Sequence, residues 1–183
     1  MTTTTATAKT IWNLDASHSE LGFKVKHMMI TNVSGSFGKF DVKVETEGDD
    51  FSTAKIDFTA DVASVTTGSE QRDGHIKSPD FFDVANYPEM KFVSSELKNL
   101  GNDNYELQGN LTINAITKPV TLNVECGGMG IDPWGNQKAG FTINGKINRT
   151  EWNLVWNAPL AAGGLLVSEE VRIHADVQFS KQA

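Results

Sequence analysis

Residues 54–62 read Ala-Lys-Ile-Asp-Phe-Thr-Ala-Asp-Val, so apolar and polar side chains alternate along the whole stretch. Successive side chains of a β-strand point to opposite faces, and this period of two predicts a strand with one buried and one wet face. The same alternation recurs at residues 21–29, 38–44, 90–97, 105–113, 120–126, 139–147 and 171–179. The chain therefore holds eight predicted strands, preceded by a short one at residues 11–14.

Short, turn-rich connections join several of these stretches. Residues 48–50, 101–104 and 132–136 carry the Gly, Asn and Asp residues that hairpin loops favour. Sequential strands are therefore expected to be antiparallel neighbours. Strands with one apolar face either stack as two sheets or close on themselves, and closure removes the unpaired edges that invite aggregation. We favour an all-β fold, a single antiparallel eight-stranded barrel.

Two connections are too long for hairpins. Residues 66–89 include a segment with helical character at 69–73, and then two adjacent aromatics, Phe81 and Phe82. Residues 149–169 include two tryptophans and several leucines. Loops this long usually carry function. We therefore expect a short helix and apolar capping loops on the barrel.

Length and charge limit the function classes. The 183 residues suit one domain, which we place at residues 11–181, after a disordered tail at residues 1–10. The formal net charge is −7 and the basic residues form no stripe, which argues against nucleic acid as a partner. No run approaches the roughly 20 apolar residues that a membrane span requires. The tail lacks a secretory pattern, so we expect a cytoplasmic protein.

The apolar faces of the predicted strands also carry small residues: Gly38, Ala54, Ala60, Ser94, Gly109, Ala139, Gly145 and Ala175. Each stands where a bulky side chain would fill the interior, and an eight-stranded barrel can be packed solid or hold one small ligand. Glycine in a strand can equally mark a bend or bulge. A filled barrel would serve as an interaction domain, with Phe81, Phe82, Trp152 and Trp156 as its partner surface. The pattern alone leaves both alternatives open.

If the barrel is hollow, its lining predicts the ligand. The large inward residues are Phe23, Val25, Phe40, Phe58, Phe92, Leu111, Leu122, Phe141 and Ile143. They offer aliphatic and aromatic surface without fixed charge, so a polar ligand would lose its hydration without compensation. A long hydrocarbon fits, because each CH₂ group removed from water contributes about 0.8 kcal/mol.

Few polar residues are placed to do chemistry. His27 shares the apolar face of its stretch, either as a hydrogen-bonded core residue or as a contact for the polar end of a ligand. Arg72 and His75 lie beside the expected cap, either within an ion-paired helix or as part of the site. No metal-ligand spacing or Gly-x-Ser-x-Gly elbow is present, and Cys126 lies within a strand. We expect a binding protein without metal or cofactor; the alternative is an enzyme with His27 or His75 as acid or base.

Several short motifs together resemble the YceI-like family. In chain order they are Asp15-Ala-Ser-His-Ser19, Phe23-Lys-Val-Lys-His27, Val33-Ser-Gly-Ser-Phe37, Arg72-Asp-Gly-His75, Ser78-Pro-Asp-Phe-Phe-Asp83, Tyr87-Pro88, Gly109-Asn-Leu-Thr-Ile113, Thr117-Lys-Pro-Val120, Asn148-Arg149 and Val167-Ser-Glu-Glu-Val171. The likeness covers residues 12 to 180. Two positions depart from the pattern. Ala115 stands where a turn usually has glycine, and Trp152 brings a bulky indole near a loop that would close the cavity.

The resemblance implies a lipocalin-like barrel that binds a polyisoprenoid or an isoprenoid quinone, with the tail threaded through the barrel, often as a homodimer. The implied role is that of a carrier or sequestering protein, although a fold alone does not fix a function. The expected ligand contacts then add Met29, Phe81, Phe82 and Trp156 to the large inward residues. Either His27 or the group of Arg72 and His75 is expected near one end of the tunnel.

Overall fold

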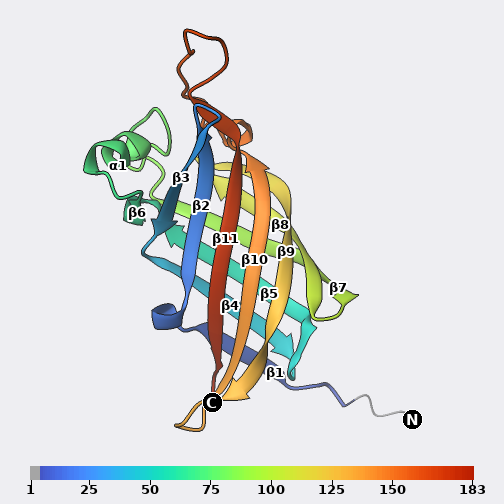
Figure 1. Ribbon diagram of the computed structural model, residues 1–183. Helices are drawn as coiled ribbons and strands as arrows, with labels where there is room; N and C mark the ends of the chain where they lie inside the picture. Colours follow the sequence, from blue (N-terminus) through green and yellow to red (C-terminus); the bar gives the residue numbers. More distant parts are fainter. Residues whose placement is uncertain (1–4) are drawn as a thin grey trace.

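The computed structural model describes residues 5–183 (Figure 1). Its strands are β1 Lys9–Leu14, β2 Glu20–His27, β3 Thr31–Phe37, β4 Phe40–Glu47, β5 Asp50–Asp61, β6 Val65–Thr66, β7 Glu89–Gly101, β8 Asn104–Ile113, β9 Ile116–Ile131, β10 Gln137–Asn148 and β11 Val167–Lys181. Its helical segments are α1 Glu70–Lys77 and the short 3-10 helices η1 Ala16–His18, η2 Val62–Ser64 and η3 Arg149–Trp152. A strand lies at every predicted stretch, and α1 lies where a short helix was expected.

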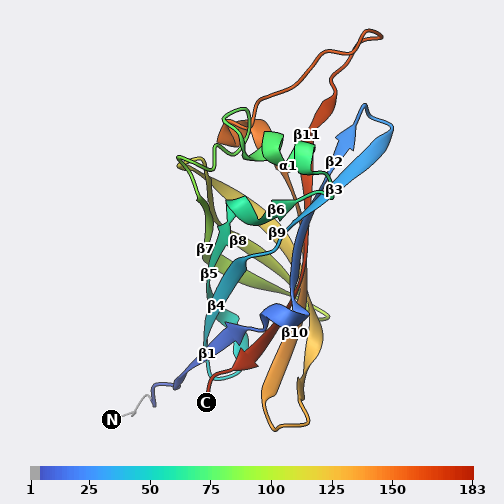
Figure 2. The same ribbon diagram turned by 90° about the vertical axis from the view of Figure 1, so that its left-hand side faces the viewer.

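Eight of these strands close into a ring. The order is β1-β4-β5-β7-β8-β9-β10-β11, and each neighbouring pair is antiparallel. The ring closes because β1 also pairs with the end of β11, where Trp12 lies opposite Lys181 and Leu14 opposite Phe179. The predicted fold class, a single antiparallel eight-stranded barrel with a short helix, is confirmed (Figures 1 and 2).

β2 and β3 lie outside this ring and extend its wall at one end. β2 pairs with the first part of β11, with Phe23 opposite Ile173, and β3 pairs with β2. Because η1 separates β1 from β2, these two strands follow the same edge of β11 one after the other. The sequence counted residues 21–29 among the eight barrel strands, whereas the short N-terminal strand β1 closes the ring.

The period of two does not predict β3. The middle of this strand, Ser34-Gly-Ser36, is small and polar. The reason lies on the neighbouring strand, where the ring of Phe23 covers Gly35 so closely that a Cβ atom there would overlap with it. A contact between two strands therefore explains the small residues of β3, and such a contact leaves no periodic pattern in the sequence.

Two predicted boundaries differ from the structure. β2 ends at His27, because Met28 and Met29 adopt left-handed backbone angles, φ 52° and 60°, in the turn that leads to β3. β1 begins at Lys9, inside the predicted tail, so the barrel starts earlier than residue 11. The first part of that tail, residues 1–4, lies outside the described residues.

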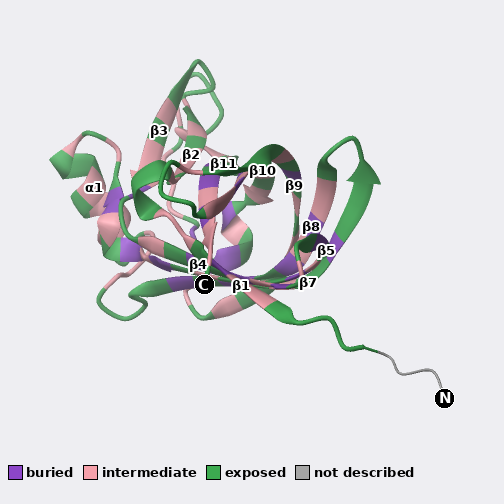
Figure 3. Ribbon diagram, turned by 90° about the horizontal axis from the view of Figure 1, so that it is seen from below, coloured by how far each residue is buried: buried purple, intermediate pink, exposed green. Residues whose placement is uncertain are grey.

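Aromatic side chains close the lower end of the barrel interior. Trp12 is wholly buried, and its Nε1 donates a hydrogen bond of 3.0 Å to Thr46 Oγ1. The ring of Phe51 lies 4.8 Å from both Trp12 and Phe141, and Phe141 lies 6.0 Å from Phe179. Seen from below, buried and half-buried segments make up much of the barrel wall, whereas the hairpin ends that project from it are exposed (Figure 3). We call Trp12, Phe51, Phe141 and Phe179 the floor.

Candidate functional site

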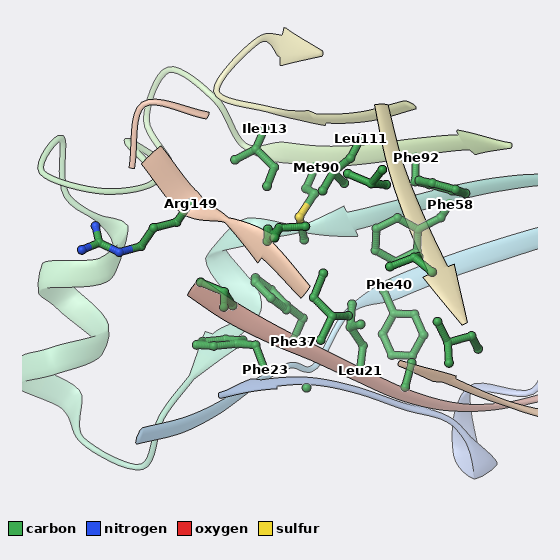
Figure 4. A pocket seen from close by; sticks show the side chains of 18 of the residues that line it. Leu21, Phe23, Phe37, Phe40, Phe58, Met90, Phe92, Leu111, Ile113 and Arg149 are labelled. Atoms are coloured by element: carbon green, nitrogen blue, oxygen red, sulfur yellow. The ribbon is translucent and has the colours of Figure 1, made fainter. Parts of the chain in front are cut away.

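An apolar cavity of about 440 Å³ lies inside the barrel above the floor (Figure 4). This volume is in the range of small-molecule sites. The barrel is therefore hollow, and the filled-barrel alternative is wrong. All but one of the predicted contacts line the cavity, namely Phe23, Val25, His27, Phe40, Phe58, Arg72, His75, Phe81, Phe82, Phe92, Leu111, Leu122, Phe141, Ile143 and Trp156.

Met29 is the exception. It lies beyond the end of β2, and 61% of its surface is exposed. The period of two placed it on the inward face with Val25 and His27, but that period holds only while the chain remains a strand. The left-handed turn at Met28 and Met29 ends the strand, and the period of two ends with it.

The small residues open the cavity less directly than the sequence argument assumed. Among the eight, only Ala54 and Ala175 line it. Gly109 and Gly145 provide room for a neighbouring side chain, because a Cβ atom there would overlap with Phe92 and Leu122, respectively. Glycine on these strands therefore lets large side chains lie flat against the wall, which leaves the axis of the barrel free.

The upper end of the cavity, opposite the floor, is partly open. There the rings of His75, Phe81 and Trp156 pack against one another with centroid distances of 5.2, 4.6 and 5.5 Å. We call these three residues the mouth cluster. All three are half-buried, whereas every floor aromatic is buried. A ligand can therefore enter past the mouth cluster and not through the floor.

The polar lining groups gather at the mouth. They are Lys26, His27, Arg72, His75 and Arg149, and no carboxylate lines the cavity in the part of the chain that the structure describes. The deeper wall offers only apolar side chains, where an unpaired polar group would be costly. The arrangement suits an elongated molecule with an apolar tail in the barrel and a polar or anionic end at the mouth.

The Arg72 region differs from the ion-paired helix that the sequence offered as one alternative. Arg72 donates from Nε to Thr67 Oγ1 at 2.7 Å and from Nη2 to the Thr67 carbonyl at 2.9 Å. Asp73 accepts from the same threonine hydroxyl at 2.6 Å, and this bond lowers the pKa of Asp73. The imidazole of His75 is paired with Asp80, with 2.8 Å between Nε2 and Oδ2. Arg72 and His75 therefore both lie at the mouth, and each is hydrogen-bonded to a residue outside α1.

Comparison with known proteins agrees with this geometry. The YceI-like domain model matches residues 12–179. The chain belongs to the YceI-like family. It is 37% identical over 172 residues to a UPF0312 protein of Staphylococcus aureus (strain USA300), covering 93% of this chain and 98% of that protein. The resemblance inferred from the short motifs is therefore confirmed.

Solved structures give the same answer for the fold. BcnA of Burkholderia cenocepacia has a TM-score of 0.77 and 25% identity, with 90% of this chain and 98% of that chain covered. The YceI protein of Campylobacter jejuni has a TM-score of 0.75 and 29% identity, with 92% and 96% covered. A polyisoprenoid binding domain from Saccharophagus degradans shares the fold, with a TM-score of 0.63, 16% identity and coverage of 93% and 98%.

Arg149 is a feature of this YceI-like barrel that the sequence argument quoted in a motif but gave no role. Its guanidinium group is 3% exposed and donates to the carbonyls of Ser168 at 2.9 Å, Trp156 at 3.0 Å, Val167 at 3.3 Å and Leu154. Burial lowers the pKa of Arg149, and nearby Glu169 opposes that shift. The guanidinium also lies 5.9 Å from the Phe81 ring. Arg149 therefore fastens both ends of the long connection that borders the mouth.

The two departures from the family pattern have structural explanations. Trp152 is 1% exposed, donates from Nε1 to the Leu111 carbonyl at 3.0 Å and is absent from the lining, so its indole does not shorten the cavity. Ala115 has a φ of 59° in the β8–β9 turn, a conformation that favours glycine. Its neighbour Asn114 donates to the carbonyls of Phe81 and Trp152 at 3.2 and 3.1 Å, which ties that turn to the mouth.

Among residues 5–183, no three His, Cys, Asp or Glu side chains come together as metal ligands would. In the same part of the chain, the longest helix is too short and too polar to cross a bilayer.

Proposed function

We propose that this protein binds one long polyisoprenoid or isoprenoid quinone in the barrel and acts as its carrier or sequestering protein. The observation that carries the proposal is the separation of the lining, apolar from the floor upward and cationic at the mouth. The polyisoprenoid binding domain from Saccharophagus degradans, whose fold is similar, supports the same ligand class.

The energetics favour a branched hydrocarbon over a polar ligand. Transfer from water contributes about 0.8 kcal/mol per buried CH₂ group, so a long tail gains affinity along its whole length without specific contacts. Aromatic side chains such as Phe23, Phe58 and Phe92 line the path of that tail. A hydroxyl, phosphate or quinone end remains at the mouth, beside the lining residues Lys26 and His75.

A variant that fills the cavity tests the proposal. Ala175 lines the middle of the wall opposite Ile143 and Leu21, so Ala175→Phe should place a ring in the path of the tail. We expect wild-type protein to take up solanesol, a long prenyl alcohol, and Ala175→Phe to bind it at least about tenfold more weakly. Native mass spectrometry measures the bound fraction, and circular dichroism verifies the fold.

The matched control places the same ring outside the barrel. Arg172 is three positions before Ala175 on β11, and its side chain is 60% exposed, so Arg172→Phe should bind solanesol as the wild type does. The proposal is wrong if wild-type protein takes up no solanesol and its organic extract holds no long apolar molecule. Equal binding of solanesol by wild type and Ala175→Phe would mean that solanesol binds outside the barrel cavity.

An enzyme acting on an isoprenoid lipid is the second candidate, and the His75–Asp80 pair favours it. A carboxylate that holds an imidazole beside a cavity is a common acid–base arrangement. Alanine at His27 or at His75 separates the two functions. A carrier keeps most of its affinity for solanesol, whereas an enzyme keeps binding and loses turnover of the lipid.

The proposed carrier is a cytoplasmic homodimer. The homodimer is what the family resemblance implies, and the compartment is the one expected from the sequence; each has a direct measurement. Native mass spectrometry reports the number of subunits together with the ligand mass, and cell fractionation reports the compartment. A monomer, or a protein recovered outside the cytoplasm, would contradict the corresponding part of the proposal.

A further inference from the structure

Two segments project beyond the barrel at the mouth. One is the turn between β2 and β3 at residues 28–30, and the other is the connection at residues 155–166 (Figures 1 and 2). Both border the cavity, because His27, Trp156 and Leu166 belong to its lining. We call these two segments the tips.

The tips have a defined backbone structure, and hydrogen bonds join them to each other. The Met28 amide donates to the Leu166 carbonyl at 2.7 Å, and Val167 pairs with His27 across β11 and β2. Within the longer tip, the Leu166 amide donates to the Ala158 carbonyl at 2.9 Å, and Leu160 and Gly164 close its end at 3.0 Å. The tips therefore present one surface with a defined shape.

This surface is apolar and carries no formal charge. Residues 27–38 and 152–168 contain no Asp, Glu, Lys or Arg, although 21% of the chain is charged. The exposed fractions are 42% for Met28, 61% for Met29, 77% for Ile30, 57% for Val155 and 44% for Leu165. Apolar residues this exposed mark an interaction site when they are contiguous.

We propose that the tips dock on a phospholipid bilayer and insert their apolar side chains at the boundary between headgroups and acyl chains. This inference rests on the proposed function, because a long isoprenoid resides in a bilayer and must enter the cavity from it. The tips border the open end of an apolar cavity, so docking lets the tail pass without crossing water. A narrow, projecting, uncharged surface suits insertion, which demands no complementary partner.

The charge distribution identifies the kind of bilayer. Peripheral proteins that bind anionic lipids do so through clusters of Lys and Arg. Here the tips have none, and the net charge of −7 opposes approach to an anionic surface. The structure thus assigns the tips to a zwitterionic surface, with binding that changes little with salt and weakens when anionic lipid is added.

The opposite end of the molecule supplies a matched control. The β9–β10 hairpin also exposes apolar side chains, with Met129 at 53%, Ile131 at 76% and Trp134 at 83%. It contains the charged Asp132, which accepts bonds from Trp134 and Asn136. The cavity is closed at this end by the floor. Ile30 and Ile131 are thus the same residue type with the same exposure at opposite ends.

The experiment compares Ile30→Glu and Leu165→Glu with Ile131→Glu. Full-length protein is sedimented with phosphatidylcholine vesicles, with and without added phosphatidylglycerol. We expect each tip variant to lower the vesicle-bound fraction at least tenfold, Ile131→Glu to leave it unchanged, and phosphatidylglycerol to reduce binding by the wild type. No binding by the wild type, equal binding by tip variants and wild type, or loss in Ile131→Glu alone would overturn the proposal.

Two further measurements distinguish a failure of the docking proposal from a failure of the proposed function. Solanesol delivered from detergent should bind Ile30→Glu and wild type equally, because Ile30 does not line the cavity. Vesicle binding without any solanesol uptake would overturn the proposed function. Sedimentation velocity tests a second copy of the chain as the occupant. If Ile30→Glu turns a dimer into a monomer while wild type ignores vesicles, the tips are a subunit interface and the docking proposal is wrong.

Discussion

The floor and the mouth of the barrel use the same kinds of aromatic side chain with different burial. Trp12 and Phe51 at the floor are 0% and 7% exposed, and their rings pack against each other. Phe81 and Trp156 at the mouth are half-buried and lie beside His75. The floor aromatics belong to the buried core, whereas hydrogen bonds from Arg149 hold the segments at the mouth.

The two ends therefore have different roles: the floor stabilises the fold, and the mouth gives a ligand access to the cavity. A closed end needs mutual packing, and its aromatics stabilise the fold in proportion to the area they bury. An open end needs side chains that can be displaced by a ligand without unfolding the wall. The polar lining groups occur only at the mouth within the described residues, so the two ends also differ in what part of a ligand they accept.

Truncation at the floor should give the largest effect. Phe51→Ala removes a ring that contacts both Trp12 and Phe141, and we expect a loss of about 3–5 kcal/mol in the free energy of unfolding. Trp156→Ala at the mouth removes a half-exposed side chain and should cost roughly 1–2 kcal/mol. Urea denaturation followed by circular dichroism measures both. Equal losses would mean that the mouth is packed as firmly as the floor.

Removal of the Arg149 guanidinium should loosen the mouth alone. Arg149→Met keeps an apolar stem but leaves several buried carbonyls without a donor, at a cost of about 2–4 kcal/mol. Hydrogen exchange followed by mass spectrometry should show faster exchange at residues 153–168 and no change at β1. Arg172→Met, on an exposed side chain, is the control and should alter neither quantity. Faster exchange at β1 would contradict a role confined to the mouth.

The alternating stretches carried most of the fold prediction. In β5, Ala54 through Asp61 alternate because the outward residues face water, and a closed antiparallel sheet enforces the same pattern on the other ring strands. The same parity placed Phe58 and Ile143 in the cavity lining. The motifs at residues 72–75 and 78–83 then brought His75 and Phe81 into the expected site, because family resemblance carries information that periodicity lacks.

The remaining features depend on contacts between segments far apart in the sequence. Gly35 is required by the ring of Phe23, Gly109 by that of Phe92, and neither has a local signal. Arg149 donates to backbone carbonyls, which every residue possesses. The sequence therefore contains no particular residue type from which its partners could be predicted. Met29 was misplaced because the end of a strand depends on a turn conformation that its methionines did not reveal.

The smallest predicted effect concerns pH at the floor end, where Asp15 joins η1 to the end of the barrel. The carboxylate accepts from Ser17 Oγ at 2.7 Å, lies 3.0 Å from His18 Nδ1 and accepts from Lys138 Nζ at 3.2 Å. These bonds, that of Ser17 foremost, hold the pKa of Asp15 well below its usual range.

A depressed folded-state pKa stabilises the protein at pH values above the unfolded-state pKa of about 4, and this contribution is lost as the pH falls through that value toward the folded pKa. The contribution at neutral pH should be about 1 kcal/mol, reduced by solvent screening. Asp15→Asn should therefore be less stable than wild type by that amount at pH 7, with the difference shrinking below pH 4 in urea titrations. Because Asp15 lies outside the cavity, Asp15→Asn should bind solanesol as the wild type does. If the difference in unfolding free energy between Asp15→Asn and wild type does not change with pH, the geometry of the site and not the charge of Asp15 is responsible.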